Sequence, residues 1–238
     1  MSHARVIAPL VLAAAWIGAS GQDARPAATP VSGTRSQVVF AFERQGLAVS
    51  KYRFTVRSDG SAIYEGEESQ PAIGADPAAA SPAQVFGSQV SITPATADKI
   101  FALGRKLDHF NITCASKAKN IADTGTKTLS YSAPDGTGSC TYNYSENKEV
   151  EELTGMFQGM AETMDEGRIL DHLHRFDRLG LDDAMTFLAQ EVSAGRALEV
   201  GTITASLRSI ADDADVMQRV RARARTLLAL VPADSDAH

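Results

Sequence analysis

The sequence is short of cysteine and of positive charge. Its 238 residues contain only two cysteines, too few for a small scaffold held together by many disulfides. The 23 lysines and arginines are outnumbered by 29 aspartates and glutamates, so a nucleic-acid partner, which usually requires a basic surplus, is not expected. A hydrophobic fraction of 44% is too high for a disordered tail. These absences favour an ordinary globular protein and exclude the more specialised classes.

Long apolar runs are also missing, except at the N-terminus. Arg5 precedes an apolar stretch over 6–17, and the small residues of 18–21 follow it. This order is the pattern of a secretory signal peptide, and the stretch is shorter than the about 20 residues that span a membrane. We predict a signal peptide over 1–21, with an uncleaved anchor as the alternative. The protein is then exported, either periplasmic or extracellular, with no transmembrane segment after signal cleavage.

Cleavage of the signal peptide would change the composition of the chain that remains. Removal of the signal peptide also removes Trp16, the only tryptophan, and a chain without tryptophan is not favoured as a carbohydrate binder. Residues 22–35 are rich in proline, alanine, serine and threonine without apolar periodicity, which is typical of a flexible leader. The preference for arginine over lysine and the alanine-rich signal point to a bacterial source.

Alternating apolar residues predict strands in the following segment. Tyr52, Phe54 and Val56 alternate with polar residues, the two-residue period of a half-buried strand. Asp59-Gly60 then favours a tight turn into a partner strand over 62–66. Further strands are expected in the segments 38–42, 85–92, 126–132 and 138–144. The proline-containing segment 67–85 is expected to be a long loop.

Helical signals come later in the chain. Thr93 and Pro94 are typical of a helix start, and the helix is expected to continue to Leu107. After residue 145 apolar residues recur at helical spacing, first over 150–164 and then in the segments 167–177, 181–194, 202–212 and 214–230. We predict an α+β fold: N-terminal antiparallel hairpins with one or two helices over 36–146, followed by an all-helical half over 147–231. No linker separates the two halves, so the helical region can pack on the first domain.

The two cysteines are predicted to pair. In an exported protein two thiols usually form a bridge, so Cys114 and Cys140 are expected to be joined. Two free buried thiols are the alternative. A catalytic cysteine needs a neighbouring base, and no pattern in the sequence supplies one.

Asp123-Thr124-Gly125 matches the active-site tripeptide of aspartic proteases. That chemistry needs two carboxylates that share a proton, so a chain with a single copy would have to dimerise. The same tripeptide is a common turn, in which the aspartate accepts a hydrogen bond from its own backbone. The turn is favoured, and a dimeric aspartic-type hydrolase that uses Asp123 is the alternative.

His172 and His174, with Asp171 and Asp177 nearby, have the composition of a metal site. Residues two apart on a helix point to different sides, whereas a helical histidine pair that chelates a metal has i, i+4 spacing. A solvated helix face is favoured over a metal site at His172 and His174. The sequence predicts no cofactor.

A spaced motif carries the one family resemblance. Tyr52, Val56, Asp59-Gly60, Tyr64 and Gly66 stand in the pattern YxxxVxxDGxxxYxG, and a helical segment follows over 100–107. The pattern resembles exported bacterial domains of unknown function that carry a DGxxxYxG hairpin. The resemblance implies an export route and a hairpin-helix-hairpin-helix order over roughly 37–165, but no active site.

The function class follows from these observations together. The sequence carries an export signal but no set of convergent catalytic groups, so we expect a non-enzymatic binding or structural module. Its partner would be an unknown protein or a small molecule.

Overall fold

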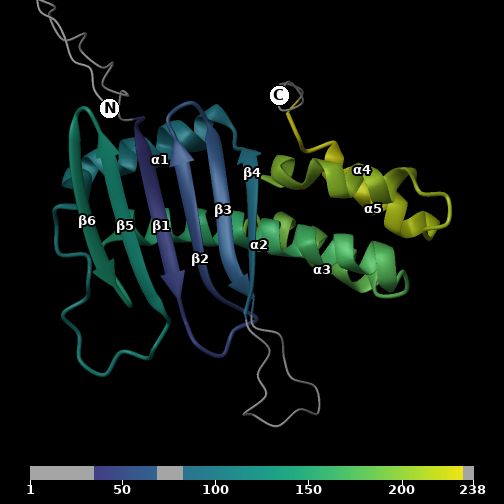
Figure 1. Cartoon of the computed structure of the whole chain (residues 1–238), viewed down its shortest axis with the longest axis horizontal. Helices are drawn as coiled ribbons and strands as arrows, with labels where there is room; N and C mark the ends of the chain where they lie inside the picture. Colours follow the sequence, from purple (N-terminus) through teal and green to yellow (C-terminus); the bar gives the residue numbers. More distant parts are fainter. Residues whose placement is uncertain (1–34, 69–82, 233–238) are drawn as a thin grey trace, which may run out of the picture. The chain divides into compact units, whose positions relative to one another are not determined.

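The computed structural model describes residues 35–68 and 83–232 (Figure 1). The predicted signal peptide, the leader up to residue 34 and most of the predicted 67–85 loop lie outside the described residues. Within the described ranges no helix is long and apolar enough to cross a membrane. The fold is α+β, as predicted, with a six-stranded antiparallel sheet in the first half and helices that dominate the second.

The sheet has the strand order β4-β3-β2-β1-β5-β6. Its strands are β1 (Gln37–Glu43), β2 (Val49–Arg57), β3 (Ser61–Glu68), β4 (Gln84–Ser91), β5 (Thr126–Ala133) and β6 (Gly136–Tyr142). Strand β1 is therefore central and pairs on one side with β2 and on the other with β5, a strand more than eighty residues away in the sequence. One face carries the buried apolar residues of the strands, such as Phe40, Phe54 and Leu129, and β4 adds the partly buried Phe86 and Val90.

Local turn chemistry explains both predicted hairpins. Gly60 takes a φ of +81°, and the Asp59 carboxylate accepts a hydrogen bond from the Ser61 N–H at 2.9 Å, which closes the β2–β3 turn. Pro134 and Asp135 form the turn between β5 and β6, with Ala133 and Gly136 paired across it. The second hairpin ends earlier than the expected residue 144, because β6 stops at Tyr142.

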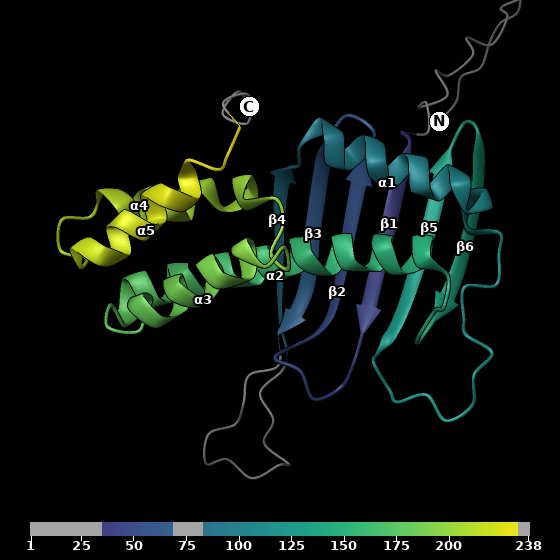
Figure 2. The same ribbon diagram turned by 180° about the vertical axis from the view of Figure 1, so that it is seen from behind.

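Two helices lie across the apolar face of the sheet (Figure 2). Helix α1 (Pro94–Lys106) begins as predicted, with the Thr93 hydroxyl capping the Thr96 N–H. Helix α2 (Lys148–Phe176) places Phe157 against the sheet, where its ring stacks on Phe40 with centroids 5.1 Å apart. The ends of the strands next to the β1–β2 turn project beyond α2.

Helix α2 corrects one expectation. The predicted helical segments before 164 and over 167–177 are a single helix of 29 residues. Gly167 does not end it: a Cβ there would lie 2.4 Å from Ile203, so the glycine permits a close helix approach. The remaining helical elements are α3 (Leu181–Ser193), the short 3₁₀ turn η3 (Val200–Ile203), α4 (Thr204–Asp212) and α5 (Gln218–Leu228).

Polar contacts tie the later helices to the sheet layer and to one another. The Glu199 carboxylate accepts hydrogen bonds from the Thr93 N–H at 2.8 Å and the Thr93 hydroxyl at 2.7 Å, at the start of α1. Asp182 of α3 accepts from Arg219 at 2.9 Å and from Arg223 at 2.6 Å on α5. The first half and the helical half are therefore in direct contact.

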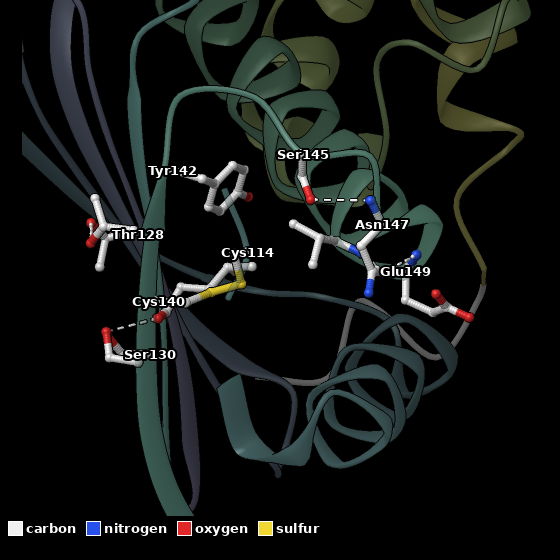
Figure 3. The surroundings of a disulfide bond; sticks show 12 residues. Cys114, Thr128, Ser130, Cys140, Tyr142, Ser145, Asn147 and Glu149 are labelled. Atoms are coloured by element: carbon white, nitrogen blue, oxygen red, sulfur yellow. Dashed lines mark hydrogen bonds between the residues drawn. A yellow bond between two sulfur atoms is a disulfide. The ribbon is translucent and has the colours of Figure 1, made fainter. Parts of the chain in front are cut away.

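The structure joins Cys114 and Cys140 as a disulfide, as predicted (Figure 3). The short 3₁₀ turn η2 (Asp108–Phe110) follows α1 and packs on β6, where Gly138 leaves room for it. The chain then returns to place Cys114 against Cys140 on the inner face of β6, with Cα atoms 5.9 Å apart. The bridge joins cysteines 26 positions apart in the sequence and fixes the loop between them beside the sheet.

Candidate functional site

A cavity of about 910 Å³ opens where the β1–β2 turn meets the second half of α2. We call it the α2 groove. Its inner wall includes the rings of Phe42 and Tyr52, which lie 5.0 Å apart between centroids. Leu47, Ile169 and Phe176 line it with 39%, 45% and 75% of their surface exposed. Three of the exposed large apolar residues of the described chain thus border one cavity, which is the pattern of a binding site.

The polar wall of the α2 groove centres on Asp165. Its Oδ1 accepts a hydrogen bond from the Tyr64 hydroxyl at 2.9 Å and another from Arg168 at 3.1 Å. Burial raises the pKa of the Asp165 carboxyl to about 6, although Tyr64 and Arg168 both act to lower it. Removal from water and the nearby Asp165 carboxylate raise the pKa of Tyr64. This carboxyl is therefore held in a poorly hydrated position.

Arg168 contacts two carboxylates and an aromatic ring. It pairs with Glu68 at the end of β3 as well as with Asp165. Its guanidinium also lies over the ring of Phe86, 3.6 Å from the centroid. These contacts fix the arginine between the sheet and α2, so its charge is shared by two carboxylates.

Glu162 stands one turn before Asp165 and lines the same groove. Within the described ranges it makes no hydrogen bond or ion pair. Its pKa is raised chiefly by burial, then by the Glu191 carboxylate, while Arg196 acts in the opposite direction. Glu162 therefore presents an incompletely satisfied carboxylate to the groove.

The two other candidate sites have different surroundings. Asp123 lies in an exposed turn, where its Oδ1 accepts the Gly125 N–H at 2.8 Å. His172 packs beside Phe176 at the groove, whereas the His174 Nε2 lies 2.8 Å from Asp213. The two histidines thus have separate neighbours. The described part of the chain holds no group of three or more potential metal ligands.

His174 also belongs to a contact that the sequence did not suggest. The Ser209 hydroxyl lies 3.4 Å from its Nδ1, on the opposite side of the ring from Asp213. That distance is at the limit of a hydrogen bond, and Asp213 is further engaged by Arg178 at 3.2 Å. The arrangement joins the end of α2 to the end of α4, and we interpret it as a structural contact.

Sequence reasoning missed the α2 groove. Glu162, Asp165 and Arg168 follow one another at three-residue spacing, which places them on one face of α2. The buried Met160 and Met164 lie on a different face of the helix, so the three charged residues form a stripe of their own beside the apolar one. Helical spacing shows this charged stripe, but not the sheet residues that complete the groove, because they are distant in the sequence.

Comparison with known proteins adds no assignment: the chain matches no protein-family model, and no curated protein is significantly similar to it.

Proposed function

We propose that this is an exported, non-enzymatic binding protein that holds its ligand in the α2 groove. The observation that carries the proposal is the meeting, in one cavity, of exposed apolar side chains and a carboxylate, that of Glu162, with no hydrogen-bonding or ion-pair partner among the described residues. A volume of about 910 Å³ is of the size that encloses a small organic molecule. The predicted signal peptide and the disulfide are both compatible with an oxidising compartment outside the cytoplasm.

Binding of the neutral, apolar dye Nile red tests the proposal. Replacing Ile169 by glutamate puts a charge on the apolar wall, and we expect the dye affinity to fall about fivefold or more. Phe187→Glu is the matched control, because Phe187 is 43% exposed on α3 and does not line the groove, compared with 45% for Ile169. Dye fluorescence titrations measure both variants. Equal affinities in wild type and Ile169→Glu would contradict the proposal.

The hydrolase alternative stays a prediction. It requires a second Asp123 from another copy of the chain. The resemblance to exported DGxxxYxG domains supports an export route and supplies no active-site residues.

A further inference from the structure

We propose that the ligand of the α2 groove is an amphiphile with a positively charged amino group on an apolar body. This inference rests on the proposed function and adds the chemical class of the ligand.

Carboxylates outnumber guanidinium groups along the groove. Its lining includes four carboxylates, of Glu68, Glu162, Asp165 and Asp171, and two guanidinium groups, of Arg168 and Arg175. Arg168 is already shared by Glu68 and Asp165. The surplus is therefore negative, and a cation entering the groove meets a favourable potential.

Two carboxylates in particular are open to a donor. Only Oδ1 of Asp165 is engaged by described residues, so its Oδ2 is left for a ligand. The Glu162 carboxylate has neither oxygen engaged in the described chain. An ammonium group has three N–H donors and no acceptor, so it can satisfy both carboxylates at once, whereas an anion would add to the repulsion.

The neighbouring wall suits the rest of such a ligand. The Tyr52 ring lies beside Phe42, and an aromatic face attracts an organic cation that approaches within about 6 Å. Leu47, Ile169 and Phe176 provide apolar surface for a hydrocarbon chain or ring. Asp165 is mostly buried and Glu162 is half-buried, so less water competes with the ammonium here than at a fully exposed carboxylate.

Three ligands that share one alkyl chain test the charge: n-decylamine, decan-1-ol and decanoate, each titrated calorimetrically below its aggregation concentration. We expect n-decylamine to bind about tenfold more tightly than decan-1-ol, and decanoate to bind most weakly. Glu162→Gln should lower the affinity for the amine about tenfold and leave the affinity for the alcohol unchanged. This variant removes no described hydrogen bond, so the fold is retained. Glu65→Gln, on the exposed side of β3, is the matched control.

The possible outcomes separate the two proposals. Equal binding of the amine and the alcohol, both weakened by Ile169→Glu, would overturn the amino-group inference and leave the groove as a binding site. An equal loss of amine and alcohol binding in Glu162→Gln would also overturn the inference, as would the absence of amine binding. If Nile red binding is unaffected by Ile169→Glu as well, the proposed function itself is wrong.

Discussion

The β5–β6 end of the sheet and the α2 groove differ in how completely their polar side chains are hydrogen-bonded. At the β5–β6 end, hydroxyl groups pair across the strands, as in Thr128 with Thr141 and Ser130 with Ser139, each at 2.9 Å. The buried Lys127 ammonium donates to the carbonyl oxygens of Thr124, Gly125 and Asn143. In the groove, by contrast, Glu162 has no hydrogen-bonding or ion-pair partner among the described residues.

This contrast separates stability from binding. A buried polar group that has all its partners contributes to a unique fold, whereas one that lacks a partner weakens the folded state until a ligand supplies it. The disulfide reinforces the satisfied end, and three exposed apolar residues, Leu47, Ile169 and Phe176, border the unsatisfied one. We therefore expect the β5–β6 end to stabilise the fold and the α2 groove to change conformation more easily when a ligand binds.

Removal of the disulfide should have the largest effect on stability. The double variant Cys114→Ala, Cys140→Ala frees the loop between these positions in the unfolded chain, and we expect the free energy of unfolding to fall by about 3 kcal/mol. Urea titration of the wild type and the variant measures the loss. Glu162→Gln serves as the groove counterpart, with an expected change of less than about 0.5 kcal/mol. Similar losses for both variants would break the contrast.

The dependence of stability on pH should be concentrated near the groove. Glu166 is 8% exposed, and burial, with Glu162, Asp165 and Glu191 nearby, raises the pKa of its carboxyl from 4.5 to about 7. The folded protein then keeps this proton over a range in which the unfolded chain has lost it. Stability from this group is therefore complete below about pH 4.5 and is lost as the pH rises to about 7.

Glu166→Gln checks this pH dependence. Because glutamine has no proton to lose, the variant should be more stable than the wild type at pH 8 by about 1–2 kcal/mol, and equally stable at pH 4. Urea midpoints at the two values of pH provide the measurement, with Glu65→Gln as an exposed control. A constant difference between the variant and the wild type at both values would show that the carboxyl does not titrate as stated.

Much of the fold could be predicted because its signals are local. The period of Tyr52, Phe54 and Val56 and the chemistry of Asp59-Gly60 act within a few residues, and the structure has the expected hairpin there. The continuity of α2 was not predicted, because helical spacing over 150–164 and over 167–177 does not show whether the two segments join into one helix. The central position of β1 in the sheet could not be predicted either, because the alternation of apolar residues does not show which strand pairs with which.

The α2 groove depends on such long-range pairing. Asp165 and Tyr64 are 101 residues apart in the sequence and meet only when α2 crosses β3. From the sequence, Glu162 and Asp165 are ordinary charged residues of a helix. Asp-Thr-Gly and the two histidines are easier to recognise as candidate sites than the groove, because their residues lie close together in the sequence.

Asp123→Asn should have the smallest effect, and it separates a turn residue from a catalytic one. The asparagine Oδ1 can still accept the Gly125 N–H, so the free energy of unfolding should change by less than about 0.5 kcal/mol, whereas Asp123→Ala removes the acceptor and should cost about 1 kcal/mol. We expect no proteolysis at acid pH from the wild type or from Asp123→Asn, measured with a denatured protein substrate. If the wild type cleaves the substrate at acid pH and Asp123→Asn does not, the chemistry lies at the β5–β6 end of the sheet. The contrast between a structural end and a binding end would then be wrong, because a catalytic dyad would need this exposed turn to face a second copy of the chain.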